Sequence, residues 1–189
     1  NNTQPINTTS GADYKMIDSV EDFNNFYKLL ITKKEFAFDT ETSSLDVINA
    51  DVLGFSFAWT KKQAWFINFR NPEIKKLSLE KLKPILENSE IKKVGHNLKF
   101  DIKVLRVLGI ELRGISFDTI IAAYLVNPGR GLRLEELAFS YLGYKKLKLI
   151  DLLDEPPKKK KEINVLDIPL NRLAWYAAED ADITLRLYD

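Results

Sequence analysis

The chain has 189 residues, of which 45% are hydrophobic, and a formal net charge of +1 at pH 7. A chain of this length buries roughly 70% of the surface that its unfolded form exposes, so we expect one globular domain. The near-neutral charge excludes a surface that holds nucleic acid through a general basic excess, and any contact with a polyanion must be local. No apolar run approaches the roughly 20 residues of a membrane span. The absence of cysteine excludes disulfides and thiolate metal sites and is compatible with a reducing cytoplasm.

The two ends of the sequence differ from the middle. Residues 1–12 are polar and lack periodicity, so we expect a disordered linker ahead of a domain spanning 13–189. The first residue is not Met, and the chain stops at Asp189 within a helical pattern. We therefore expect a piece of a longer protein.

Short strands and helices follow one another along the domain. The predicted strands are 14–17, 36–41, 52–59, 63–69, 92–95 and 114–117. The predicted helices are about 19–30, 78–88, 98–108, 119–126, 132–143 and a last helix that Pro169 opens. The segment 154–162, "DEPPKKKKE", has the composition of a loop. A strand meander followed by alternating short strands and helices predicts a mixed α/β sheet with both faces covered.

Asp39 and Glu41 stand at the end of the apolar segment "FAF". Strand alternation places both carboxylates on one face, where two like charges are unfavourable without a cation. Two interpretations follow: an exposed strand end with solvated acids, or a pair that holds a cation.

Asp101 and Asp180 favour the second interpretation. The residues at helical spacing from Asp101 are apolar: Leu98, Val104, Leu105 and Leu108. Asp180 has a similar setting on the last helix, and Tyr176 lies one turn before it on the same face. A buried charge needs a counter-ion or hydrogen-bond partner, so both acids should meet one or reach open space.

Glu179 and Asp182 lie on another face of the same helix, together with Trp175 and Arg186. Asp182 and Arg186 have the spacing of an ordinary i, i+4 ion pair. We expect a solvated helix face for both acids.

Four acids and one histidine, His96, indicate which cation would bind. Mg²⁺ and Mn²⁺ take oxygen ligands from a few carboxylates and substrate phosphate, and four acids suit two such ions. His96 precedes a helix, where a turn or packing role is expected, so Zn²⁺ is disfavoured. Two ions roughly 4 Å apart stabilise the attacking and leaving oxygens of a displacement at phosphorus, which favours phosphodiester hydrolysis. Tyr176, with an ordinary pKa near 10, would orient the attacking water and would be a poor base.

Three segments resemble the exonuclease motifs of the DEDD superfamily in its tyrosine-bearing subgroup: "FDTET", "GHNLKFD" and "YAAEDAD". The text from "VGHNLKFD" to "LVNPG" closely resembles the proofreading domain of bacterial family A DNA polymerases, and the likeness runs from Tyr14 to Asp189. The resemblance implies a ribonuclease-H-like fold, with a mixed five-stranded sheet flanked by helices. It also implies two-metal hydrolysis at single-stranded or frayed 3′ ends of DNA, releasing 5′-mononucleotides. A polymerase domain would follow in the same parent chain, and we expect a monomer in the bacterial cytoplasm at the nucleoid, with an organelle as the alternative.

The resemblance also implies individual roles. Residues matching Asp39, Glu41 and Asp180 hold the first metal, and those matching Asp39 and Asp101 hold or orient the second. Glu41 would also approach the terminal 3′-hydroxyl, and Tyr176 would orient the nucleophile. The implied substrate contacts are Thr40, Thr42, Leu45 and Asn97. Leu45 would be an apolar wedge against the last base, and the alternative is a loop residue packed on the core.

Other interpretations remain open. From 144 to 167 the sequence departs from the family pattern, and its lysine run would either meet DNA phosphates or form a solvated loop. The same acids would serve an RNA-directed exonuclease. A catalytically silent module that binds DNA or supports a polymerase would keep the fold, although the presence of all four acids argues against silence.

Overall fold

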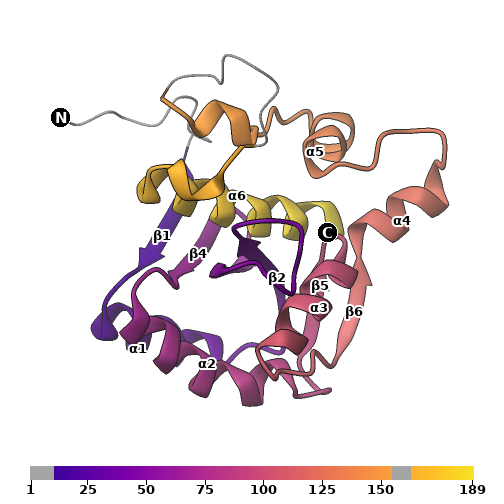
Figure 1. Ribbon diagram of the computed structural model, residues 1–189. Helices are drawn as coiled ribbons and strands as arrows, with labels where there is room; N and C mark the ends of the chain where they lie inside the picture. Colours follow the sequence, from indigo (N-terminus) through magenta and orange to yellow (C-terminus); the bar gives the residue numbers. More distant parts are fainter. Residues whose placement is uncertain (1–10, 155–162) are drawn as a thin grey trace.

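A computed structural model describes residues 11–154 and 163–189 (Figure 1). Most of the predicted linker 1–12 and of the lysine-rich loop 154–162 therefore lies outside the described residues. The elements are β1 (Asp13–Ile17), α1 (Val20–Leu30), β2 (Glu35–Thr42), β3 (Val52–Thr60), β4 (Gln63–Asn68), α2 (Pro72–Leu86), β5 (Lys92–Gly95), α3 (Leu98–Val107), β6 (Ile115–Asp118), α4 (Thr119–Val126), α5 (Leu134–Leu142), the 3-10 helices η1 (Leu149–Leu152) and η2 (Val165–Asp167), and α6 (Leu170–Tyr188).

The strands form one mixed sheet in the order β1-β4-β3-β2-β5-β6. The meander β2-β3-β4 is antiparallel, whereas β1, β5 and β6 pair in parallel with their neighbours. The sheet has six strands, so the expected count of five was wrong. All six strands predicted from the sequence are present, and β1, predicted at 14–17, pairs with β4 from Asp13 opposite Gln63 to Ile17 opposite Ile67 and forms an edge of the sheet.

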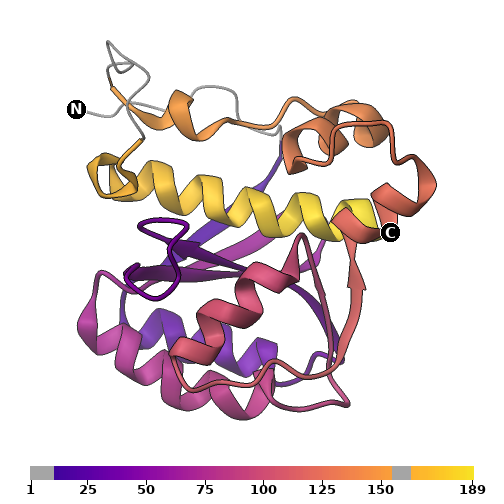
Figure 2. The same ribbon diagram turned by 45° about the vertical axis from the view of Figure 1, so that its right-hand side comes forward.

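The two faces of the sheet carry side chains of different size, and Figure 2 shows the helices that cover each face. Helices α1, α2 and α3 lie on one side, over buried aromatic residues such as Phe36, Phe38 and Phe57. Helix α6 lies on the other side. Strand alternation explains the division in β2, since Phe36 and Phe38 face one way while Ala37 faces the other.

Alanines form most of the contact between α6 and the sheet. The buried residues of this cluster are Ala37, Ala58, Ala64, Phe66, Ala174, Ala177, Ala178, Ala181 and Leu185. Small side chains allow a helix backbone to approach a sheet closely. The polar residues of α6 are therefore held near the polar end of β2.

Two further findings concern the helices. Helix α2 begins at Pro72 and not near 78, because the Asn71 side chain accepts hydrogen bonds from the N–H groups of Glu73 and Ile74 at 3.1 and 3.4 Å, and Pro72 suits the first turn. Across residues 11–154 and 163–189, no helix has the length and apolar character needed to cross a membrane.

Candidate active site

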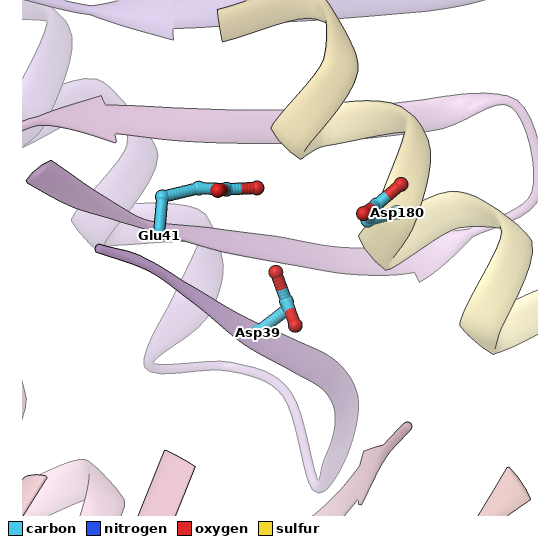
Figure 3. Close-up of side chains that lie close together, drawn as sticks. All are labelled: Asp39, Glu41 and Asp180. Carbon is cyan, nitrogen blue, oxygen red and sulfur yellow. The ribbon is translucent and has the colours of Figure 1, made fainter. Parts of the chain in front are cut away.

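Asp39, Glu41 and Asp180 converge at one end of the sheet (Figure 3). Asp39 and Glu41 project from the same face of β2, and Asp180 comes from α6. Each offers one carboxylate oxygen, and these three oxygens lie within 4.8 Å of one another. The predicted proximity of the strand pair and the last helix is therefore observed.

The environment of these acids disfavours their charged forms. Burial, and then the nearby Asp101 carboxylate, raises the pKa of Asp39 well above its ordinary value. Burial and the Asp180 carboxylate raise the pKa of Glu41 to about 8. Burial also raises the pKa of Asp180 to about 6. A bound cation would reverse these shifts, because it stabilises the charged carboxylates.

The donor set fits a hard divalent cation. The buried Asp180 Oδ1 already faces a cation, the Lys146 ammonium, so the acids of this group lie where a positive charge is accommodated. Carboxylate oxygens are the ligands that Mg²⁺ and Mn²⁺ prefer. The His96 Nδ1 lies 2.8 Å from the Thr119 hydroxyl, and His96 borders the cavity next to the acids without belonging to the three-acid group.

Asp101 lies apart from the three-acid group but borders the same cavity. Its carboxylate oxygen Oδ1 accepts hydrogen bonds from the Thr40 N–H at 2.9 Å and the Thr40 hydroxyl at 2.7 Å. Burial raises its pKa to about 7, although the Thr40 hydroxyl limits the rise. The cavity has a volume of about 680 Å³ and is lined by Asp39, Asp101, Tyr176 and Asp180 among others. All five predicted catalytic side chains except Glu41 thus border this cavity, and Glu41 joins them through the three-acid group.

Tyr176 lies one turn before Asp180 on α6, as the helical spacing predicted. The Asp180 carboxylate, and secondly burial, raises the pKa of the Tyr176 hydroxyl above its ordinary value of 10. The hydroxyl therefore keeps its proton at neutral pH. It can donate a hydrogen bond to orient a water molecule, and it cannot serve as a base.

The residues predicted to contact substrate occupy different settings. Leu45 is 87% exposed at the rim of the cavity, so the alternative in which it packs on the core is wrong. Asn97 borders the same cavity with a left-handed backbone at φ 63°, and its N–H donates to the Asp118 carboxylate. The Thr42 hydroxyl donates to the Ser44 carbonyl at 2.8 Å. Thr40 is buried, and its hydroxyl supports Asp101. The substrate roles of these residues stay predictions.

The expected solvated face for Glu179 and Asp182 was wrong, because both residues are completely buried. Asp182 accepts hydrogen bonds from the Tyr14 hydroxyl and the Lys62 N–H, each at 2.6 Å, and lies 3.6 Å from Arg186. The physical reason differs between the two acids. Asp182 is covered by β1 and by the turn between β3 and β4, which supply Tyr14 and Lys62. Glu179 faces the segment that follows α5, which lies over α6 (Figure 2).

Glu179 holds that segment in place. Its carboxylate accepts hydrogen bonds from the Tyr144 hydroxyl and from the Leu147 N–H at 3.2 Å. Burial raises the pKa of Glu179, and the nearby Lys146 ammonium limits the rise. Glu179, the sequence neighbour of Asp180, therefore links α6 to the segment that follows α5.

Lys146 is the site residue that the sequence did not indicate. It follows α5 in a stretch without helical or strand periodicity, where a buried lysine leaves no signal. Its side chain is 2% exposed and forms an ion pair with Asp180.

Comparison with known proteins places the chain in a family. The model of the 3′-5′ exonuclease family of family A DNA polymerases matches residues 14–189. DNA polymerase I of Pseudomonas aeruginosa is 34% identical over 187 residues, covering 94% of this chain and 20% of the relative. DNA polymerase I of Borreliella burgdorferi is 32% identical over 195 residues, covering 100% of this chain and 21% of the relative. The chain thus spans about a fifth of the length of these curated relatives.

A solved structure shares the fold. The catalytic core of RRP6 from Trypanosoma brucei superimposes with a TM-score of 0.71 and 20% sequence identity, covering 97% of this chain and 47% of that protein. This likeness confirms the predicted fold class. Because the family match covers the chain from Tyr14 to its last residue, the chain belongs to the 3′-5′ exonuclease family of family A DNA polymerases.

Proposed function

We propose that this domain hydrolyses the 3′-terminal phosphodiester bond of a DNA strand and releases 5′-mononucleotides. The observation that carries the proposal is the convergence of Asp39, Glu41 and Asp180 within 4.8 Å, beside a cavity that Asp101 and Tyr176 also line. Membership of the exonuclease family supports the reaction, and the name DNA polymerase I of the two relatives supports DNA as the substrate.

In this proposal the acids share the work of holding two ions. Asp39, Glu41 and Asp180 would hold one Mg²⁺ or Mn²⁺, and Asp39 with Asp101 would hold or orient the other. Such ions, when bound, supply a hydroxide at neutral pH and offset the charge that develops on the phosphate. The choice of oxygen ligands over histidine favours Mg²⁺ or Mn²⁺ over Zn²⁺.

The remaining residues would bind and orient the substrate. The Tyr176 hydroxyl, protonated at neutral pH, would direct a lone pair of the attacking water toward phosphorus by hydrogen bonding. Glu41 would also accept a hydrogen bond from the terminal 3′-hydroxyl. Leu45, exposed at the cavity rim, would pack against the last base, while Thr40, Thr42 and Asn97 would be the further contacts.

The proposal extends to the parent protein. Since the relatives are about five times longer than this chain, we place the domain in a longer chain that also carries a polymerase domain. The domain itself would act as a monomer on single-stranded or frayed 3′ ends, in the bacterial cytoplasm at the nucleoid.

A degradation assay tests the proposal. A 5′-labelled single DNA strand is incubated with the protein and Mg²⁺ or Mn²⁺, and with a chelator. We expect stepwise shortening from the 3′ end that the chelator stops and that Asp39→Asn abolishes. Glu21→Gln is the matched control, because it also removes one negative charge but lies exposed on α1, behind the other face of the sheet. Faster shortening of a matched RNA strand would overturn the DNA assignment, and intact DNA under all conditions would indicate a silent module.

A further inference from the structure

Lys146 lies against the residues that would hold the first ion. Its ammonium Nζ forms an ion pair with Asp180 Oδ1, a buried carboxylate oxygen. The same ammonium lies 3.6 Å from the centre of the Tyr176 ring and 3.8 Å from Glu179 Oε2. Lys146 thus contacts both Asp180 and Tyr176, which lie one turn apart on α6.

Lys146 is also the main compensating charge of the site. Within residues 11–154 and 163–189, no other lysine or arginine forms an ion pair with Asp39, Glu41, Asp101 or Asp180. Its charge opposes the burial-driven rise in the pKa of Asp39, Glu41 and Asp180. Because the lysine is buried, salt in the solvent screens these interactions only weakly.

A second cavity beside Lys146 offers another position for its ammonium group. Lys146 borders another cavity of about 550 Å³, whose lining includes the acids Glu135, Glu136 and Asp151 as well as basic residues such as Lys145 and Lys148. A lysine side chain has a flexible four-carbon stem and can rotate its charge from one cavity to the other. A divalent ion beside Asp180 would repel the ammonium from its present position, because both are cations competing for one carboxylate oxygen.

We propose that Lys146 is a built-in counter-ion of the metal site, which holds the metal-free acids together and competes with the first divalent ion for Asp180. This inference rests on the proposed function, since it takes the acids to be metal ligands. It has two consequences. The lysine stabilises the folded protein in the absence of metal, and it lowers the affinity of the site for metal.

The test measures Mn²⁺ binding by electron paramagnetic resonance and by calorimetry, without substrate. We expect Lys146→Met to bind Mn²⁺ with a Kd about tenfold lower than the wild-type protein, because one competing positive charge is gone. The melting temperature of the metal-free variant should fall, and its rise on adding Mn²⁺ should exceed that of the wild type. Lys81→Met is the matched control, because it removes an exposed lysine charge on α2, away from both cavities, and should leave the Kd nearly unchanged. Lys146→Arg keeps the charge and should restore weak binding.

A measurement on the unaltered protein covers the case in which Lys146→Met does not fold. Lysine side chains labelled with ¹³C are followed by NMR during a Mg²⁺ titration, with the Lys146 signal assigned from Lys146→Arg. We expect this signal to move in proportion to metal occupancy.

The outcomes separate the two proposals. Equal or weaker Mn²⁺ affinity in Lys146→Met, or a Lys146 signal unmoved by saturating Mg²⁺, overturns the counter-ion inference while the site remains. Mn²⁺ binding that survives Asp39→Asn, or that the wild-type protein lacks, overturns the metal site itself and the inference with it.

Discussion

Thr40 and Asp101 are joined by two hydrogen bonds to a single oxygen atom. The backbone N–H and the hydroxyl of Thr40 both donate to Asp101 Oδ1, which ties β2 to α3 beneath the cavity. These two hydrogen bonds fix the orientation of the Asp101 carboxylate relative to β2. Thr40 is thus a positioning residue in this structure.

Thr40→Val tests this relationship. The change keeps the shape of the side chain but removes the hydroxyl donor, so we expect a loss of about 1–2 kcal/mol in the free energy of unfolding, measured by urea denaturation. Exonuclease kcat should also fall, because Asp101 gains freedom. Thr60→Val, at an exposed position on β3, is the control and should change neither quantity. Unaltered kcat in Thr40→Val would show that Asp101 does not need this support.

Tyr176→Phe tests the orienting role of the tyrosine. Because the hydroxyl keeps its proton at neutral pH, its removal should lower kcat by about tenfold to a hundredfold while leaving Mn²⁺ affinity unchanged. Tyr141→Phe, an exposed tyrosine of α5, is the control. The assignment would be contradicted if the pH–rate profile of the wild-type protein showed a titrating base between about pH 6 and about pH 9 that is missing from the profile of Tyr176→Phe.

Glu41 makes the stability of the metal-free protein depend on pH. Its pKa is raised to about 8 by burial and by Asp180, so the folded protein binds a proton more tightly than the unfolded chain. The contribution of Glu41 to stability therefore falls as pH rises from its ordinary pKa of 4.5 through about 8.

Comparison with Glu41→Gln tests this effect, because glutamine does not titrate and also removes the contribution of Glu41 to the raised pKa of Asp39. We expect the variant to gain stability relative to the wild-type protein as pH rises, measured by urea midpoints in the presence of a chelator. Saturating Mg²⁺ should abolish the trend, since the cation stabilises the charged carboxylate. A constant difference between the two proteins across this range would refute the predicted pKa shift.

Asp182 should matter to folding, although it lies two residues from a proposed metal ligand. Asp182→Ala removes the acceptor of the Tyr14 hydroxyl and of the Lys62 N–H, and the partner of Arg186, at a completely buried position. We expect a loss of about 3–5 kcal/mol in the free energy of unfolding. Asp189→Ala breaks an exposed ion pair with Lys61 and should cost less than about 1 kcal/mol. Similar losses in the two variants would contradict the structural role of Asp182.

Sequence patterns located the acids of the site because each one interrupts an apolar periodicity. Asp39 and Glu41 follow a buried strand, and Asp101 lies on an apolar helix stripe that the structure shows to be buried. The patterns could not give their distances, since these depend on how closely α6 packs on β2. The resemblance supplied the roles of Thr42, Leu45 and Asn97, which no periodicity would have indicated.

The errors have a common physical cause. Glu179 and Asp182 looked solvated because a helical wheel assigns one buried face to a helix. In the structure α6 is covered on further sides, at Glu179 by the segment after α5 and at Asp182 by β1 and the β3–β4 turn. Lys146 was missed for the same reason. A segment without periodicity gives no sign that it will close over a helix, so its one inward-facing charge cannot be distinguished from its exposed neighbours.

The alanine contact between α6 and the sheet sets the distance between the acid on α6 and the acids on β2. Asp39 and Asp180 belong to separate elements, and the thickness of side chains such as Ala37 and Ala177 fixes the gap between them. One added methyl group at this contact would widen the gap and move Asp180 away from Asp39 and Glu41, without altering any of the three acids. A random screen for inactive variants should therefore return substitutions of these alanines alongside those of the acids.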